Sequence, residues 1–422
     1  MRVFYRLGTA GEKKIFENYP TKYYGIAVGA NLAAFYPDWL PTFLRAVRKP
    51  FFVDPVTHVF ARSLENIKKD SEVKKSFHKL AKAYSHELVD LIEKDGRQLI
   101  PKDFLSNGRW NTKFMEELAK NVIGFQMEIM QAPSQPSLLE YAEILGEKIP
   151  EEVKGPEFLV APYFYSPSCH DPWYGISLEV AKQAISFKGS LPLFAVICTA
   201  RELLLNKVDI KQVAKDYDEF DGYILWISEF DEKQEGEEYL TGLIDMVKEL
   251  AMGKKPVYTL YGEYFSTMIS KFGLSGYCRG ICYGASKSVD AAGGGGARLP
   301  QRYYIELNHG KLSETVARTF FSDNPGELCN CEVCSNVIKH THESDPAKKV
   351  AGFFDKMDFE STRAHFLVVH ARELEELPIA QLKDIVKQLE ASAQKCHDLK
   401  AQFYNVSDDH LHRWRSVLAK RI

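Results

Sequence analysis

The sequence has few cysteines, no long apolar run and little net charge, and each absence limits what the protein can be. Only 8 of the 422 residues are cysteine, and five of the eight are scattered. No run of 18 apolar residues occurs, so a membrane-spanning helix is not expected. The first residues, MRVFYRLGTAGEKK, lack an apolar signal segment, so we expect a cytoplasmic protein without disulfides. A formal net charge of −3 argues against a polybasic nucleic-acid binder, although it is compatible with a local basic groove.

Short apolar runs rich in β-branched and aromatic residues are, by contrast, numerous. Eight of them lie at 23–32, 50–60, 157–165, 192–200, 221–230, 255–265, 276–285 and 302–311. Amphipathic helical patterns separate most of these runs, as at 176–187 and 238–252, where apolar residues recur at spacings of three and four. Strands that alternate with helices predict an α/β fold, a (β/α)8 TIM barrel that occupies residues 1–320.

Three segments depart from this alternation. Residues 63–150, between the second and third predicted strands, contain helical patterns and predict an insertion that either covers the barrel or forms a lid or partner-binding subdomain. The loop at 288–301 contains four consecutive glycines and is either a surface linker or a mobile loop at the barrel mouth. Residues 321–422 are expected to form a zinc-binding, helical C-terminal subdomain, with an amphipathic helix from Pro378 to about Phe403.

Three cysteines are clustered in GELCNCEVCS, where Cys329, Cys331 and Cys334 form a C-x-C-x2-C pattern. Thiolates bind zinc well, and a closed site with four protein ligands has a structural role. Histidines at 340, 342, 365 and 370 are the candidates for the fourth ligand. We favour His365, because it opens an apolar helix that would hold its ring in place, and His370 is the alternative.

Carboxylates at the C-terminal ends of the predicted strands are the candidate catalytic groups, because barrel enzymes react at that end. Asp54 ends the second predicted strand, Glu229, Asp231 and Glu232 follow the fifth, and Glu263 follows the sixth. One carboxylate can stabilise a positive charge that develops during a reaction, and a second acidic group can donate or accept a proton. We predict that Asp54, Asp231, Glu229 and Glu263 are catalytic. The alternatives are a helix cap for Asp54 and a solvated acidic loop for Glu229 and Asp231.

The cysteine cluster, followed by a helix that begins His365-Phe366-Leu367, resembles the zinc subdomain of the tRNA-guanine transglycosylases. The stretches FDGYILWISEFDE (220–232) and FFVDPVTHVF (51–60) are similar to two strands of that family. Three segments are most similar to the branch that inserts 7-deazaguanines into DNA. They are the strand with Leu225-Trp226, called the LW strand, the strand that ends in GICYG (280–284), called the GICYG strand, and the glycine-rich loop at 288–301. The resemblance implies a barrel enzyme with a structural zinc that exchanges guanine in nucleic acid, DNA rather than tRNA, for a 7-deazaguanine.

The resemblance, together with the stacking that aromatic rings offer a flat base, also indicates the residues that contact substrate. The expected base-binding residues are His58, Phe164, Trp173, Asp221, Gly222, Trp226 and Tyr283. Arg279, Lys287 and Arg298 flank the seventh predicted strand and the glycine loop, where they would contact phosphates. The family's nucleophilic Asp has no counterpart, because GICYGASKS offers only Tyr283, Ser286 and Lys287 in its place.

Three functions are compatible with these features. The first is base exchange on guanine in nucleic acid. The second is a non-catalytic subunit that assists an active partner, which the missing Asp favours. The third is a zinc-stabilised hydrolase of a nucleoside or nucleotide. A homodimer or a partner subunit is expected by analogy. A second carboxylate that faces Asp54 across the barrel mouth would support catalysis, and dispersed carboxylates would support the subunit.

Overall fold

The structure, a computed structural model, describes residues 1–8, 12–130, 155–281, 284–291, 300–341, 343–377 and 379–422. Its centre is a sheet of eight parallel strands in the spatial order β3-β2-β1-β12-β11-β10-β9-β8. The strands are β1 (Arg2–Leu7), β2 (Gly25–Gly29), β3 (Phe51–Asp54), β8 (Leu159–Val160), β9 (Leu193–Thr199), β10 (Gly222–Ile227), β11 (Val257–Thr259) and β12 (Leu274–Gly280). The two sheet edges meet where the Glu157 amide donates a 2.8 Å hydrogen bond to the Phe51 carbonyl. The predicted α/β barrel is therefore confirmed as a nearly closed, eight-stranded parallel barrel.

The identity of two strands differs from the prediction. The first barrel strand is β1, which pairs with β2 and β12 and was not predicted, because two arginines interrupt the apolar residues of its RVFYRL segment. Residues 302–311, predicted as the eighth barrel strand, instead form an antiparallel hairpin outside the barrel sheet, β13 (Arg302–Ile305) with β14 (Gly310–Ser313). Hydrophobic alternation is the same in a barrel strand and in a hairpin, so the pattern could not separate them. Asp54 consequently ends the third barrel strand.

Aromatic side chains fill the interior of the barrel near the N-terminal ends of its strands. Phe158 stacks between Phe52 and Phe194, with centroid distances of 4.8 Å and 4.1 Å. Phe4 packs edge-on against Phe52 at 5.1 Å. Because side chains alternate along a strand, the residue two positions after each of these phenylalanines in β1 and β3 also faces inward, nearer the C-terminal end. The rings thus form a floor, and the inward side chains that follow them lie above it.

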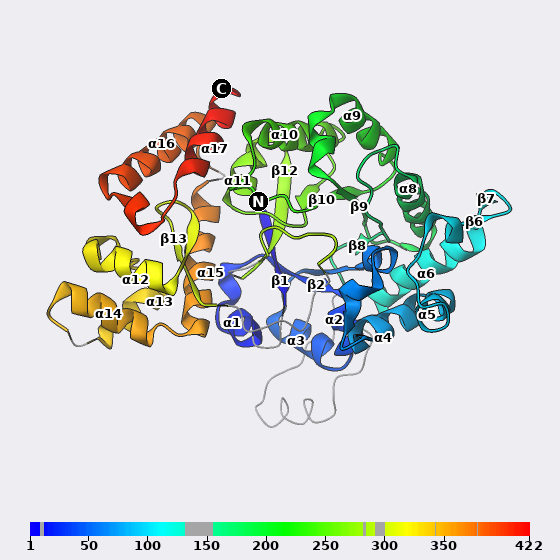
Figure 1. The fold of residues 1–422 in the computed structure, drawn as a ribbon, viewed down its shortest axis with the longest axis horizontal. Helices are drawn as coiled ribbons and strands as arrows, with labels where there is room; N and C mark the ends of the chain where they lie inside the picture. Colours follow the sequence, from blue (N-terminus) through cyan, green and yellow to red (C-terminus); the bar gives the residue numbers. More distant parts are fainter. Residues whose placement is uncertain (9–11, 131–154, 282–283, 292–299, 342, 378) are drawn as a thin grey trace.

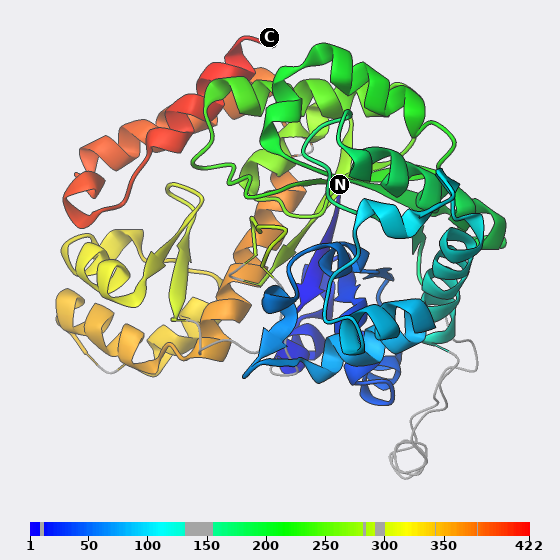
Figure 2. The ribbon, with the colours of Figure 1, turned by 45° about the vertical axis from the view of Figure 1, so that its right-hand side comes forward.

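Helices surround the barrel in both ribbon views (Figure 1, Figure 2). They include α1 (Lys13–Asn18), α2 (Ala30–Phe35), α3 (Trp39–Val47), α8 (Pro172–Ala184), α9 (Lys207–Asp216), α10 (Glu237–Ala251) and α11 (Tyr264–Met268). The segment between β3 and β8 contains α4 (Lys75–Tyr84), α5 (His86–Glu93), α6 (Thr112–Glu128) and two short hairpins, β4–β5 (Lys68–Lys69 with Glu72–Val73) and β6–β7 (Leu105–Ser106 with Arg109–Trp110). From α6, the Gln126 amide bonds both backbone polar groups of Val160, at 2.8 and 2.9 Å, and so completes the short strand β8. Residues 131–154 of the predicted insertion lie outside the described residues.

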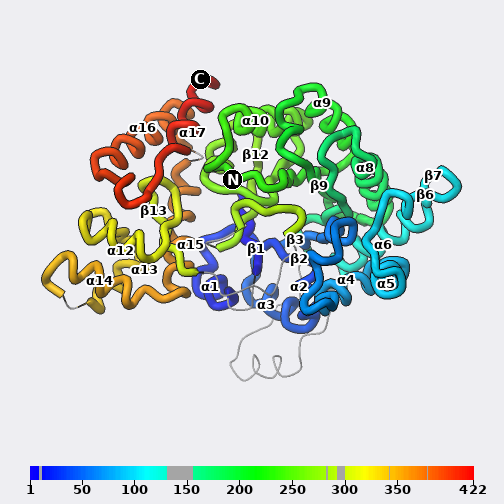
Figure 3. Tube along the Cα trace, in the orientation of Figure 1, coloured from blue at the N-terminus to red at the C-terminus, as the bar shows by residue number. Residues whose placement is uncertain are grey.

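The remainder of the chain packs on one side of the barrel. After the β13–β14 hairpin come α12 (Glu314–Asp323), α13 (Glu332–Lys339), α14 (Pro346–Lys356), α15 (Phe359–Glu376), α16 (Leu382–Asp398) and α17 (Asp409–Ala419). Helix α15 lies between the barrel and α12–α14 (Figure 3). Its buried His370 contacts the barrel wall, with Nδ1 2.5 Å from the Tyr5 hydroxyl and Nε2 2.6 Å from the Tyr277 hydroxyl. None of the described helices combines the length and apolarity needed to cross a membrane.

Candidate functional site at the barrel mouth

Polar and aromatic side chains from several strand ends converge above the phenylalanine floor. Arg6 and Asp54 occupy the next inward positions after Phe4 in β1 and Phe52 in β3. Trp226 is the last inward residue of β10, and Tyr163 follows β8 with the same inward orientation. The C-terminal ends of parallel strands meet at one end of a barrel, so these groups share one site.

Asp54 is a buried, ionised carboxylate that accepts three hydrogen bonds. Its side chain is 3% exposed. Oδ2 accepts from Arg6 Nη2 at 3.0 Å, while Oδ1 accepts from the Tyr163 hydroxyl at 2.8 Å and from the Val56 amide at 3.2 Å. Burial alone would raise the pKa of Asp54, but the charge of Arg6 and the hydrogen bonds outweigh it, so its pKa is lowered. The mouth therefore holds a fixed negative charge.

The chain directly after Asp54 is strained. Val56 has φ of 55° and ψ of 26°, a left-handed conformation that β-branched residues rarely adopt. This conformation directs the Val56 amide at Asp54 Oδ1. Backbone strain of this kind costs about 1–3 kcal/mol and gathers at functional sites. The turn thus favours a site that positions the Asp54 carboxylate over one that only caps a helix.

Arg6 has one guanidinium nitrogen that bonds nothing among the described residues. Nη2 binds Asp54, and the guanidinium carbon lies 4.8 Å from the ring centroid of Tyr261, which follows β11. Nη1 is buried without a hydrogen-bond partner. A buried donor that stays unpaired costs about 1–3 kcal/mol, so such a group is typical of a binding site that a ligand completes. Arg6 was not among the predicted site residues, because β1 itself was not predicted.

His58 is the second buried group without a partner. It is 1% exposed, and within the described part of the chain neither ring nitrogen finds a hydrogen-bond partner. Its ring stacks on Tyr163 at 5.3 Å and meets Trp226 edge-on at 4.5 Å. Burial and the charge of Lys287 lower the pKa of His58 to about 3, although Asp54 opposes them. A neutral imidazole offers one donor and one acceptor to a bound molecule.

Lys287, predicted to contact phosphates, lies at the mouth instead of on an outer surface. Its Nζ is 5.9 Å from the Trp226 ring centroid, and its carbonyl accepts a 3.2 Å hydrogen bond from Trp226 Nε1. Burial and the charge of Arg6 lower the pKa of Lys287 to about 8, while Asp54 acts in the opposite direction. The predicted residues that the structure brings together at the mouth are therefore Asp54, His58, Trp226 and Lys287.

Asp221 and Gly222 lie at the opposite, N-terminal end of β10, which contradicts their predicted role in base binding. Asp221 Oδ2 accepts hydrogen bonds from the Leu193 amide at 2.8 Å and from Lys188 Nζ at 2.5 Å. A Cβ atom at Gly222 would lie 2.5 Å from the Phe194 ring. Both residues serve the start of β10: Asp221 anchors it to β9, and Gly222 leaves room for the aromatic floor.

Glu263 and Arg279 also depart from their predicted roles, because they face away from the barrel interior. Glu263 lies 3.5 Å from Lys233 and from Arg279 and 3.7 Å from Lys311. Burial would raise the pKa of Glu263, but the three cations lower it to about 2. Arg279 is 2% exposed, and its guanidinium carbon lies 4.5 Å from the Phe366 ring of α15. A buried, paired arginine cannot reach a phosphate, so Arg279 holds α15 to the barrel.

The other predicted acids do not face Asp54. Asp231 accepts a 3.0 Å hydrogen bond from the Lys233 amide, and burial together with Glu263 raises its pKa. Glu229 is exposed, with φ of 59°. The carboxylates are thus dispersed: among the described residues, neither the Asp231 nor the Glu229 carboxylate forms a hydrogen bond or ion pair with the mouth groups that surround Asp54, although the Glu229 amide bonds the Lys287 carbonyl.

The aromatic residues after β8 divide between the barrel interior and the helical layer. Phe164 and Trp173 pack together at 5.0 Å, and both contact Phe104 in the segment between β3 and β8. They form part of the outer core, which contradicts their predicted contact with a base. Tyr163, one residue earlier, has the opposite orientation and bonds Asp54. Tyr283 and Arg298, the remaining predicted contacts, lie outside the described residues.

A metal-ligand group lies beyond the barrel. Ligand atoms of Cys329, Cys331, Cys334 and His365 all lie within 4.8 Å of one another. The cysteines precede or begin α13, and His365 comes from α15. His365 Nδ1 lies 3.4 Å from Cys331 Sγ and 3.2 Å from Cys334 Sγ. Three thiols and an imidazole in this arrangement could hold a metal ion, and they include every predicted ligand.

The surroundings of His365 fix its orientation. Its Nε2 donates a 2.9 Å hydrogen bond to the Tyr304 carbonyl, which leaves Nδ1 to face the thiols. The Tyr303 ring stacks on the imidazole at 4.3 Å. His370, the alternative ligand, is instead bonded to two tyrosines of the barrel wall. The group follows the β13–β14 hairpin and α12, and not a barrel strand as predicted.

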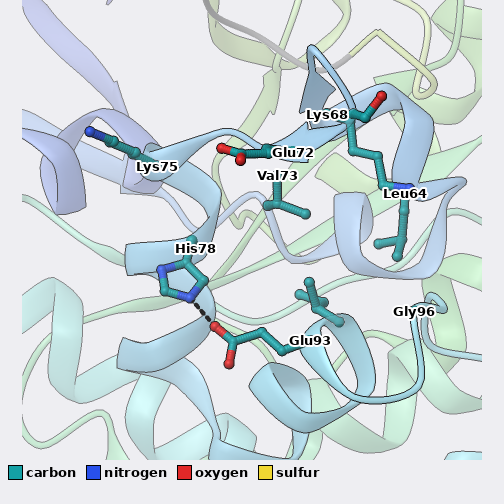
Figure 4. Close-up of a pocket in the computed structure, with 10 residues that line it drawn as sticks. Leu64, Lys68, Glu72, Val73, Lys75, His78, Glu93 and Gly96 are labelled. Carbon is teal, nitrogen blue, oxygen red and sulfur yellow. Dashed lines mark hydrogen bonds and ion pairs between the residues drawn. The ribbon is translucent and has the colours of Figure 1, made fainter.

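A separate cavity of about 480 Å³ lies against the β4–β5 hairpin, α4 and α5 (Figure 4). Leu64, Val73 and Ile92 supply apolar lining, and His78 pairs with Glu93 at its edge. Within the described residues, no buried side-chain atom that lacks a hydrogen-bond partner lines this cavity. The barrel mouth, with Arg6 and His58, is the better candidate for a site that a ligand completes.

Comparisons with protein-family models and with curated proteins found no match to this sequence. The functional assignment therefore rests on the geometry of the mouth and of the metal-ligand group, together with the resemblance carried by the sequence motifs.

Proposed function

We propose that the protein exchanges guanine in a nucleic acid, DNA rather than tRNA, for a 7-deazaguanine at the barrel mouth. The observation that carries this proposal is the ionised Asp54 beside flat rings and beside two groups, Arg6 Nη1 and the His58 ring, that lack partners among the described residues. A flat heterocycle with polar edges and a sugar that develops positive charge would use all of these groups.

The carboxylate of Asp54 suits the charge that base exchange creates. Cleavage of an N-glycosidic bond develops positive charge at the sugar C1′ and ring oxygen. A buried carboxylate whose ionised state is enforced by Arg6 stabilises that charge without reorganising, and its effect is larger than in water. Asp54 would therefore act on the transition state more than on the bound substrate.

The neighbouring groups suit a guanine-type base. Arg6 Nη1 can donate to a carbonyl oxygen, and neutral His58 can accept from an amino or imino group or donate to a ring nitrogen. Trp226 and Tyr261 supply aromatic surface, and stacking on such rings contributes about 1–3 kcal/mol per base. The LW strand, the GICYG strand and the glycine-rich loop favour DNA over tRNA as the substrate.

For the metal-ligand group, we propose a structural zinc held by Cys329, Cys331, Cys334 and His365. Three thiolates and one imidazole match the ligand preference of zinc, and four protein ligands leave no open position for a reaction. When bound, the ion would cross-link α13 to α15. The residues contribute the orientation of the imidazole, through the Tyr304 carbonyl, and the shielding of the thiolates.

A second function is favoured by one observation, the dispersal of the acids. Asp231 and Glu263 lie in or beside the Lys233 ion network, and Glu229 is exposed, so no second described carboxylate contacts the Asp54 site. A protein of this kind could bind the base while a partner subunit performs the reaction. Activity that appears only when a partner is added would support this alternative.

The proposed function is tested by incorporation of a labelled 7-deazaguanine into plasmid DNA and, separately, into tRNA. Wild type should label DNA, and Asp54→Asn should reduce the rate by about 100-fold or more, since it keeps the shape but removes the charge. Asp231→Asn, whose side chain lies outside the mouth, is the matched control and should retain activity. Labelling of tRNA alone would overturn the DNA assignment, and release of guanine without incorporation would indicate a hydrolase.

A further inference from the structure

We infer that the side-chain amine of Lys287 is the nucleophile that attacks the sugar C1′ during base exchange. The inference rests on the proposed function and identifies the group that replaces the Asp missing from the GICYGASKS segment. It starts from the position of Lys287, whose ammonium lies beside Trp226 and within the electric field of Asp54 and Arg6.

The backbone around Lys287 is fixed to the end of β10. The Lys287 carbonyl accepts hydrogen bonds from Trp226 Nε1 at 3.2 Å and from the Glu229 amide at 3.0 Å. Two residues later, the Val289 amide donates to Ser228 Oγ at 3.2 Å, and the Val289 side chain is buried in the barrel interior. These contacts direct the Lys287 side chain toward the mouth.

A further ion pair holds the same segment from another side. Asp290 bonds Arg62 through both carboxylate oxygens, at 2.6 Å and 2.8 Å. Arg62 follows β3 by way of the turn that contains His58, so the segment with Lys287 is tied to two strand ends of the mouth. A reactive group carried on a backbone fixed in this way loses little further freedom when substrate binds.

Other potential nucleophiles at the mouth are less suited to the attack. Both oxygens of Asp54 already accept hydrogen bonds, which lowers their basicity and leaves the carboxylate as a source of charge. Burial raises the pKa of Cys278 to about 12 and also raises that of Cys198, so both are neutral thiols. Neither thiol is exposed, because both are packed into the interior core.

The amine of Lys287 is available for the reaction. No described residue forms a hydrogen bond or ion pair with its ammonium, and the charges of Arg6, Asp54 and Lys74 act on it. Burial and Arg6 lower its pKa to about 8, against the effect of Asp54. About one tenth of the side chain is therefore an uncharged, nucleophilic amine at pH 7.

The exchange then balances without an outside oxidant or reductant. The Lys287 nitrogen forms a bond to C1′ as the C1′–N9 bond to guanine breaks, and the proton released by the new ammonium goes to the departing base. In the reverse sense, the incoming 7-deazaguanine gives up its N9 proton, bonds to C1′ and displaces the amine. The glycosylamine formed in this way can also open its sugar ring, which gives an imine between Lys287 and C1′ that a hydride donor reduces irreversibly.

The imine provides the test. Full-length protein is incubated with sodium cyanoborohydride and an oligodeoxynucleotide that carries one abasic site, whose open form presents C1′ as an aldehyde. Peptide mass analysis should locate one DNA adduct on Lys287. Lys287→Arg keeps the charge but cannot form the imine, and should reduce the adduct by about tenfold or more. Lys74→Arg, a lysine close enough to act on Lys287, is the matched control and should keep the adduct.

The outcomes separate this inference from the proposed function. Base exchange by wild type without an adduct on Lys287 would overturn the inference and leave the function standing. An adduct on Lys287 without any incorporation of 7-deazaguanine would support Lys287 as an amine that reacts at C1′ but would overturn base exchange as the reaction that it serves. Adducts spread over many lysines, or retained in Lys287→Arg, would overturn the inference. Equal melting temperatures of the variants and wild type would show that loss of the adduct is not loss of the fold.

Discussion

Replacement of Arg6 by methionine should destabilise the protein more than replacement of Arg6 and Asp54 together. Methionine keeps much of the aliphatic stem but leaves the Asp54 carboxylate buried, with the Tyr163 hydroxyl and the Val56 amide as its remaining donors among the described residues. Removal of one partner from a buried ion pair costs about 3–5 kcal/mol. In the double variant Arg6→Met/Asp54→Asn no charge is stranded, and the asparagine oxygen still accepts both bonds, so the cost should fall to about 1–2 kcal/mol.

The difference should depend on pH in a defined direction. The pKa of Asp54 lies below its usual 3.8. Burial alone would raise it, but the charge of Arg6 and the hydrogen bonds outweigh burial. Wild-type Asp54 therefore contributes stability that is present above that value and is lost as the pH falls through the folded pKa. Without Arg6 the pKa of Asp54 rises, so the buried carboxyl becomes protonated, and loses its charge, at a higher pH. The gap between wild type and Arg6→Met should be widest at pH 7 and narrower at pH 4.

Urea unfolding followed by tryptophan fluorescence gives the required free energies, since the chain contains 5 tryptophans. Wild type, Arg6→Met, Asp54→Asn and the double variant form a complete cycle at each pH. Equal losses for Arg6→Met and the double variant at pH 7 would refute the reasoning. A gap that stays constant between pH 7 and pH 4 would refute it as well, because the stranded charge would then not be its cause.

Three further outcomes are expected. Cys331→Ser should lose bound metal and lower the melting temperature, as measured by elemental analysis and thermal unfolding, and an unchanged metal content would contradict the metal centre. His58→Phe keeps a flat ring against Tyr163 but removes two nitrogens without described partners, so it should raise the free energy of unfolding by about 1–3 kcal/mol while it reduces base incorporation; a less stable variant would contradict this account of His58. Burial raises the pKa of Glu232 from 4.5 to about 7, against the effect of its hydrogen bond to Ser266. Folding therefore favours the protonated form of Glu232. Its contribution to the free energy of unfolding is complete below pH 4.5. As the pH rises from 4.5 to 7, that contribution is lost at up to about 1.4 kcal/mol per pH unit. Glu232→Gln should flatten this part of a stability–pH curve, and an unchanged slope would assign it to other groups.

Sequence periodicity was sufficient for the barrel but not for the identity of every strand. Alternation between strand-like and helix-like runs identified seven of the eight barrel strands, because that alternation is a property of the fold as a whole. The missing strand, β1, is six residues long. The surplus one, at 302–311, obeys the same alternation in a hairpin. Whether a strand joins the barrel or a hairpin depends on the strand with which it pairs. Hydrophobic periodicity carries no information about that partner.

The site was predictable where a side chain ends a strand and not where it depends on orientation. Asp54 directly ends β3, so its inward direction follows from Phe52 two residues earlier. Glu263 lies four residues after β11 ends, by which point the strand no longer fixes its direction. Tyr163 and Phe164 are adjacent and chemically similar, yet they face opposite sides of the barrel wall. The spacing of the three cysteines, in contrast, is local, and the favoured fourth ligand, His365, lies with them in the structure.

Helix α15 carries a metal ligand and a barrel contact within two turns. His365 faces the thiols of the α13 region, and His370 bonds Tyr5 of β1 and Tyr277 of β12, each next to an inward-facing residue of the barrel. A chain cut after residue 320 would expose these tyrosines and the Arg279–Glu263 pair to solvent. Residues 1–320 contain all eight strands, yet we expect that they do not fold on their own, so that expression of the barrel alone yields an insoluble or poorly folded fragment.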